Sequence, residues 1–146
     1  MLSQINIRII DSVTDWKDAI HKAVQPLVDS GYVEDRYIQG IIDNTILYGP
    51  YYVLAPDVAL PHARPEQGVL VKQLGVTVLR QAVKFSADGY DVRLLITLAA
   101  VDSLSHLEAL KCLAEIISDE NRVQCILSAK TIEDIYHLFL QKKEKE

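Results

Sequence analysis

The segment around His62 combines a candidate nucleophile with a stiffened backbone. It reads LPHARPE over residues 60–66 and directly follows a short apolar stretch. Pro61 and Pro65 fix their own φ angles and favour extended geometry at the residues before them, so His62 and Arg64 should lie on a rigid loop. A reactive side chain benefits from being held in this way. Taken alone, the pattern fits equally well a hydrogen-bonded histidine with a structural role.

His106 is the second candidate. It lies in the sequence SHLE at 105–108, which fits a capping box and places the histidine in the first turn of a helix. There the helix dipole favours a neutral imidazole, and the exposed backbone N–H groups favour an anion. The alternative is a partly buried histidine with a structural hydrogen bond. His21 and His137 fall on the predicted first and last helices, and we assign neither a role.

Two neutral histidines, an arginine and a helix N-terminus could form either a site for phosphoryl groups or a metal site. The chain has no H-E-x-x-H or H-x-H motif, although Asp57, Glu66 and Asp102 could assist a metal. It also lacks a Walker phosphate loop, a G-x-G-x-x-G turn and a G-x-S-x-G motif. Nucleotide binding and a serine nucleophile therefore have no support, and a His-dependent metal hydrolase remains the alternative to phosphoryl chemistry.

Composition points to a packed globular protein with an acidic surface. The 146 residues are 49% hydrophobic and 24% charged, with six Gly and five Pro, which argues against disorder and predicts a single domain over 1–146. Fifteen Lys plus Arg against twenty Asp plus Glu give a formal charge of −5. Nucleic-acid binding needs a basic face, so no nucleic-acid partner is expected, and a basic protein partner is favoured.

Cysteine usage and hydropathy predict a cytoplasmic protein. Cys112 and Cys125 have no second pair and no C-x-x-C spacing, which favours neither a disulfide framework nor a zinc site. The chain begins without a basic segment followed by an apolar one, and the longest apolar stretch, 94–101, is far too short to span a bilayer. We therefore expect no direct membrane insertion.

Strand and helix patterns alternate along the chain and must supply the scaffold for these residues. Strands are predicted at 5–10, 51–55, 58–60, 74–79 and 83–85, and 92–101 should be a central strand covered on both faces. Helices should begin at Ser12 or Thr14, after Gly31, at Ser105, near Asn121 and at Thr131, with Pro26 kinking or dividing the first. The helix from Ser105 should face the core with Leu107, Leu110, Ala114 and Ile117. This alternation indicates a layered α/β fold.

The segment 49–66 resembles the enzyme IIA components of the bacterial phosphoenolpyruvate-dependent sugar phosphotransferase system, of the mannitol/fructose class. The motif that carries the resemblance is ALPH at 59–62. Three further matches, GPY at 49–51, AP at 55–56 and PHARPE at 61–66, are similar to the ascorbate-specific and cryptic mannitol branch. The similarity covers nearly the whole chain.

The resemblance implies a three-layer domain, with a mixed β-sheet of about five strands and helices on both faces. It also implies that His62 accepts a phosphoryl group and that His106 faces it as a second active-site histidine. Mannitol enzymes place an arginine after the Asp of the second helix, whereas Asn44 follows Asp43 here, so we assign the phosphate-stabilising role to Arg64. Asp57 is another departure, because close relatives tend to have Gly there.

The resemblance further implies the partners. His62 would receive its phosphoryl group from the histidine-containing phosphocarrier protein and pass it to the IIB component of a sugar transporter. The covalent intermediate would be a transient phosphohistidine, and no cofactor and no metal would be needed. Tyr51, Tyr52 and Leu60 are the candidates for an exposed apolar rim around the histidine. A regulatory module of the same fold is the alternative, a homodimer is left open, and the substrate could be an ascorbate-like acid or a hexitol.

Overall fold

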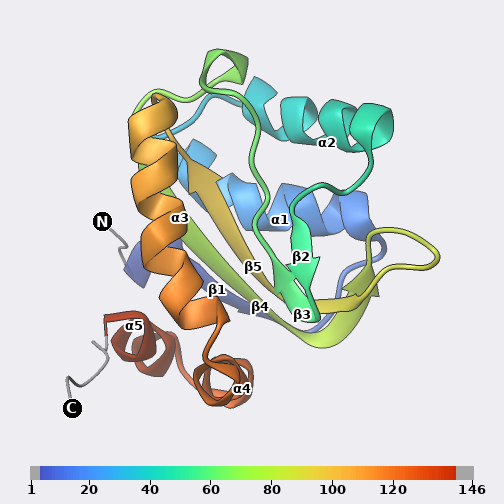
Figure 1. Cartoon of the computed structure of the whole chain (residues 1–146), viewed down its shortest axis with the longest axis vertical. Coiled ribbons are helices and arrows are strands. Elements are labelled where there is room, and N and C mark those ends of the chain that lie inside the picture. Colours follow the sequence, from blue (N-terminus) through green and yellow to red (C-terminus); the bar gives the residue numbers. More distant parts are fainter. Residues whose placement is uncertain (1–3, 141–146) are drawn as a thin grey trace.

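A five-stranded mixed sheet forms the centre of the computed structural model, which describes residues 4–140 (Figure 1). The strand order is β1-β4-β5-β3-β2. The strands are β1 (Ile7–Ile10), β2 (Val53–Ala55), β3 (Asp57–Ala59), β4 (Gln73–Lys84) and β5 (Asp91–Ala99). β1 runs parallel to β4 and β3 parallel to β5, whereas the β4–β5 and β2–β3 pairs are antiparallel.

Helices cover both faces of this sheet, which confirms the predicted three-layer α/β architecture. They are α1 (Trp16–Asp29), α2 (Arg36–Tyr48), α3 (Ser103–Ile117), α4 (Glu120–Ser128) and α5 (Ile132–Leu140), with single 3₁₀ turns η1 (Gln4–Asn6) and η2 (Pro65–Gln67). In the view of Figure 1, α1 lies behind the sheet and α3 in front of it. None of these helices, within residues 4–140, is long and apolar enough to cross a membrane.

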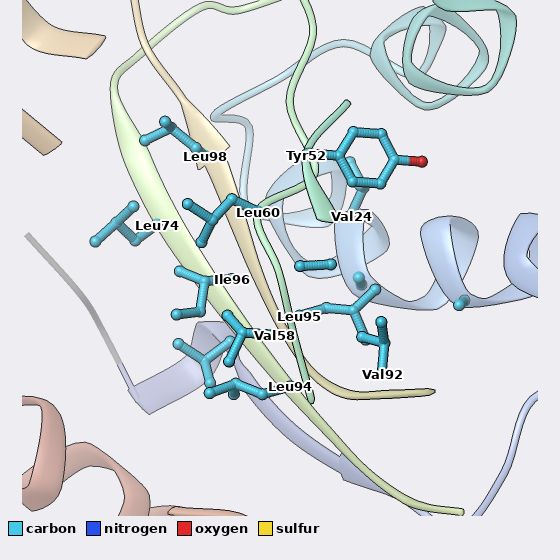
Figure 2. Close-up of a cluster of buried hydrophobic side chains, with 14 of the residues drawn as sticks. Val24, Tyr52, Val58, Leu60, Leu74, Val92, Leu94, Leu95, Ile96 and Leu98 are labelled. Atoms are coloured by element: carbon cyan, nitrogen blue, oxygen red, sulfur yellow. The ribbon is translucent and has the colours of Figure 1, made fainter. Parts of the chain in front are cut away.

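β5 is the central strand, buried on both faces as predicted. Figure 2 shows Leu94, Ile96 and Leu98 pointing to one side of the strand and Leu95 to the other. On the α1 face the hydroxyl of Thr97 donates to the Ala23 carbonyl at 3.4 Å. The continuous apolar run of this strand therefore packs against helices on both faces of the sheet.

Helix α1 contains Pro26 without being divided by it. A proline has no N–H, so the carbonyl of Lys22, four residues earlier, loses its helical donor. The guanidinium of Arg8 on β1 takes that place and donates to Lys22 O at 2.8 Å. The predicted N-caps Ser12 and Thr14 were wrong, because the cap is Asp15, whose carboxylate accepts the Asp18 N–H at 2.9 Å.

Two strand predictions were wrong in their extent. The segment 74–79 and residues 83–84 belong to one strand, β4, which ends at Lys84 and leaves Phe85 outside, and its pairing with β5 shifts register between Val78 and Val83. This irregularity falls in an exposed polar stretch, which made the strand look interrupted in the sequence. The first predicted strand begins at Ile7 instead of residue 5, because residues 4–6 form η1.

Helix α3 begins earlier than predicted. Its N-cap is Asp102, whose carboxylate accepts the Ser105 N–H at 2.7 Å, while the Ser105 hydroxyl accepts the Asp102 N–H at 3.2 Å. Ser105 therefore occupies the third helical position of the capping box and not its first position. The predicted core stripe was wrong for Leu107 and Ala114, which are exposed, whereas Leu110 and Ile117 pack against the core as predicted. The residues of α3 that are buried are Ala109, Leu113 and Ile116.

Candidate active site

A cavity of about 530 Å³ lies where α2, the loop before η2, the end of β5 and the start of α3 meet. Its lining residues are Asn44, Tyr48, Tyr51, His62, Ala63, Arg64, Pro65, Ala100, Asp102, Ser103 and His106. The three residues predicted for the site, His62, Arg64 and His106, are all among them. In Figure 1 this is the region where the loop after β3 passes between α2 and the upper end of α3.

His62 presents a neutral imidazole with one ring nitrogen already occupied. Its Nδ1 lies 2.7 Å from the carbonyl oxygen of Leu60. Since a carbonyl can only accept a hydrogen bond, Nδ1 carries the proton and the lone pair resides on Nε2. Burial lowers the pKa of His62, with a smaller lowering by His106, against the raising effect of the Leu60 hydrogen bond. The result is a nucleophilic Nε2 on a ring that the protein keeps uncharged.

His106 faces His62 from the first turn of α3. The two ring centroids are 5.0 Å apart and the ring planes are inclined by 55°. The Asp102 carboxylate that caps this helix also lines the cavity, and its hydrogen bonds to Ser105 lower its pKa. The rings therefore meet because a strand-end loop and a helix start lie side by side, although the capping residue differs from the one predicted.

Arg64 lines the cavity with an exposed side chain. Among residues 4–140 its guanidinium has no ion-pair partner, so its charge is available to an incoming anion. Burial raises the pKa of Tyr51, and the positive charge of Arg64 partly opposes that rise. An arginine in this position can bind phosphoryl oxygens in a bidentate fashion.

Tyr37 on α2 anchors the loop that carries His62. Its buried hydroxyl accepts the Ala63 N–H at 3.0 Å and donates to the Leu98 carbonyl at 2.8 Å. Burial raises the pKa of Tyr37 well above its usual value, so the hydroxyl remains neutral. The backbone beside His62 is thus fastened to the end of β5.

Tyr51 contacts the candidate nucleophile directly. Its ring packs edge-on against that of His62 at 5.2 Å between centroids, and its hydroxyl donates to the His62 carbonyl. The predicted apolar rim was wrong for Tyr52 and Leu60, which are buried. Tyr52 points inward, where its hydroxyl pairs with Thr45 Oγ1 at 2.7 Å.

An exposed apolar surface does flank the cavity, and of the three predicted candidates only Tyr51 belongs to it. A second groove shares Asp102 with the cavity and runs between residues 70–72 and α3. We use the name apolar rim for the exposed hydrophobic residues that line one of these two hollows. They are Tyr48, Tyr51, Leu70, Val71, Val101 and Leu104.

Asp57 has a backbone explanation. Its φ is 71°, in the left-handed region that favours glycine and that Asp tolerates better than most side chains. It is not among the cavity-lining residues.

No group of three or more His, Cys, Asp or Glu side chains arranged to hold a metal ion occurs within the part of the chain that the structure describes.

Comparison with known proteins identifies the family. Residues 1–142 match the family described as phosphoenolpyruvate-dependent sugar phosphotransferase system, EIIA 2. The mannitol-specific cryptic phosphotransferase enzyme IIA component of Escherichia coli (strain K12) is 42% identical over 126 residues, which are 86% of either chain. The ascorbate-specific PTS system EIIA component of the same strain is 34% identical over 135 residues, covering 91% of this chain and 88% of that one.

A solved structure shares the fold. It is the complex of enzyme IIAMTL and phosphorylated enzyme IIBMTL from Escherichia coli, matched with a TM-score of 0.85 and 24% identity over 96% of this chain and 97% of that one. The length of the family match and the identity to the cryptic mannitol and ascorbate-specific components agree with each other. The chain therefore belongs to the EIIA type 2 family of the phosphoenolpyruvate-dependent sugar phosphotransferase system and is an enzyme IIA component, as its sequence resemblance had implied.

Proposed function

We propose that His62 is the phosphoryl carrier of this enzyme IIA component, and that it receives its group from the histidine-containing phosphocarrier protein. The observation that carries the proposal is the tautomer of His62. Its Nδ1–H is bound to the Leu60 carbonyl, which leaves the Nε2 lone pair free beside the cavity. A nucleophile in this state needs no general base to remove a proton.

The transfer balances without a further reactant. The P–N bond of the donor phosphohistidine breaks as the Nε2–P bond of His62 forms, roughly in line and with charge spread over three phosphoryl oxygens. The His62 ring gains positive charge, which it shares with Nδ1–H, and the Leu60 carbonyl at 2.7 Å stabilises that charge. Arg64, His106 and the first turn of α3 surround the cavity and would stabilise the phosphoryl oxygens.

The phosphoryl group then passes to a IIB component of a sugar transporter. The family supports this direction of transfer, and the mannitol enzyme that shares the fold has been solved in complex with a phosphorylated IIB. Both proteins would dock on the apolar rim, since each must bring its reacting group to the same nitrogen. The imported substrate is of the ascorbate or mannitol type, in line with the two relatives.

The test is phosphorylation of the protein by a reconstituted series of phosphotransfer proteins. The protein is incubated with phosphoenolpyruvate, enzyme I and the phosphocarrier protein, and an acid-labile phosphate is sought by intact mass. We expect labelling of the wild type and of His21→Ala, whose histidine is exposed on α1, but none of His62→Ala. Labelling that survives His62→Ala would overturn the proposal.

A second step addresses the acceptor. Purified phosphorylated protein is mixed with IIB components of the ascorbate and mannitol types, and loss of its phosphate is followed. Transfer to one of them supports the role in uptake. Labelling without transfer to any IIB component would instead fit a regulatory module of the same fold.

A further inference from the structure

Side chains form hydrogen bonds with the backbone of all three residues 62–64 in the loop that carries the candidate nucleophile. The His62 carbonyl accepts the Tyr51 hydroxyl, and the Ala63 N–H donates to the Tyr37 hydroxyl at 3.0 Å. The Arg64 N–H donates to Oε1 of Gln67 at 2.9 Å. The contact at Arg64 leads through Gln67 to a residue on α2.

That residue is Asn44. Its Nδ2 donates to Gln67 Oε1 at 2.8 Å, and Gln67 Nε2 donates back to Asn44 Oδ1 at 3.3 Å. We call these two side chains the amide pair. Asn44 and Tyr51 also line the same cavity, where burial raises the pKa of the Tyr51 hydroxyl and the Asn44 side chain partly opposes that rise. Asn44 thus reaches the loop at Arg64 through Gln67.

The fold makes room for the amide pair at Gly40, one turn before Asn44 on the same face of α2. A Cβ at Gly40 would lie 3.1 Å from Gln67 Nε2 and 3.3 Å from Gln67 Cβ. Both distances are tighter than ordinary van der Waals contact. The absent side chain therefore lets Gln67 lie flat against α2, where its amide meets that of Asn44.

We infer that Asn44 is a positioning residue for phosphoryl transfer, acting through Gln67 to hold the loop backbone at Arg64. This inference rests on the proposed function of His62. Two prolines fix φ at their own positions but leave the peptides between them free to rotate, and the amide pair removes that freedom at Arg64, as Tyr51 and Tyr37 do at His62 and Ala63. Since a loose phosphoryl transfer depends chiefly on alignment, a small displacement of His62 or Arg64 slows it strongly.

A double-mutant cycle tests the inference. The variants are Asn44→Ala, Gln67→Ala and the double substitution, with Gln39→Ala as the matched control, since Gln39 is an exposed amide on the same helix. We expect each single substitution to lower the maximal rate of labelling about tenfold with an unchanged KM for the phosphocarrier protein. The maximal rate of labelling of the double variant should also be about tenfold below wild type, because each substitution alone already breaks the amide pair.

Other outcomes would overturn the inference. A rate near wild type for Gln67→Ala beside a slow Asn44→Ala would mean that Asn44 does not act through Gln67. Losses that multiply to about a hundredfold in the double variant would mean that the two side chains act independently. Rates of wild-type size in both single variants would remove any role for the pair.

A second readout uses the unphosphorylated protein and does not depend on the proposed function. Hydrogen exchange at the Arg64 amide, which donates to Gln67, should accelerate in Gln67→Ala and in Asn44→Ala, but not in Gln39→Ala, at an unchanged urea midpoint. Unchanged exchange would overturn the inference. A wild type that cannot be labelled would refute the proposed function, while the exchange measurement would still decide whether the amide pair holds the loop.

Discussion

At the scale of single residues, the surroundings of His62 keep its imidazole neutral and fix its orientation. The Leu60 carbonyl fixes the proton of His62 on Nδ1, and burial opposes protonation of the second nitrogen. The two effects act on the pKa in opposite directions, and burial is the larger. They nevertheless serve the same end, because the hydrogen bond orients the ring and burial preserves the lone pair.

The rate of labelling should therefore fall only in acid. Protonated His62 cannot attack, and its pKa is lowered from the ordinary value of about 6.5. The rate should stay level as the pH decreases through neutrality and decline with a midpoint below about 6.5. Single-turnover labelling and an NMR titration of the His62 ring both measure this. A midpoint at or above the ordinary value would contradict the assigned environment.

His106 should contribute to the rate and not to the attachment site. His106→Ala removes a ring that faces His62 at 5.0 Å and leaves the nucleophile in place. We expect a folded protein that is still labelled on His62, about 10²–10³-fold more slowly, as when a donor that stabilises transition-state charge is removed. His62 should also titrate at a higher pH, because His106 lowers its pKa. Labelling at the wild-type rate would refute this role.

At the scale of elements, a residue of β1 supplies the hydrogen bond that a proline removes from α1. Pro26 leaves the Lys22 carbonyl of α1 without its helical donor, and Arg8 reaches across from β1 to supply one. This contact ties the first helix to an edge strand of the sheet. It also explains why a proline that predicts a break lies inside one continuous helix.

The two residues should be energetically coupled. Arg8→Met should lower the free energy of unfolding by about 1–3 kcal/mol, because a carbonyl loses a charged donor. In a Pro26→Ala background the loss should be less than half as large, since the introduced alanine supplies a backbone N–H to the same carbonyl. Urea unfolding of the four proteins measures this. Arg36→Met, which breaks an exposed ion pair with Glu34, is the control and should change little.

The sequence predicted those features that depend on neighbouring residues. The alternation of elements, the buried β5 and the stiff loop of His62 all follow from local patterns. The cap of α3 did not, because Asp102 and Ser105 are both competent caps and only the fold selects between them. The Arg8–Lys22, Tyr37–Ala63 and Asn44–Gln67 contacts join distant segments, so no periodicity could indicate them.

At the scale of the whole molecule, the proposed function requires the surface to accept two different proteins at one nitrogen of His62. The apolar rim lies beside the cavity, and the groove that it lines also contains Lys72, Asp102 and Glu108. Charges of both signs there favour a contact whose affinity comes mainly from apolar burial. The net charge of −5 would then act on the rate of encounter with a basic carrier, an effect that weakens as salt rises.

Leu104→Ser should separate docking from chemistry. Leu104 is 65% exposed on α3, so its loss should leave the unfolding midpoint unchanged while raising the KM for the phosphocarrier protein about tenfold, at an unchanged maximal rate. Tyr90→Ser is the control, because Tyr90 is 51% exposed but precedes the start of β5, at the opposite end of that strand from the cavity. Steady-state labelling with varied carrier concentration gives both constants. Equal effects of the two substitutions would place the docking surface elsewhere, since only Leu104 belongs to the apolar rim.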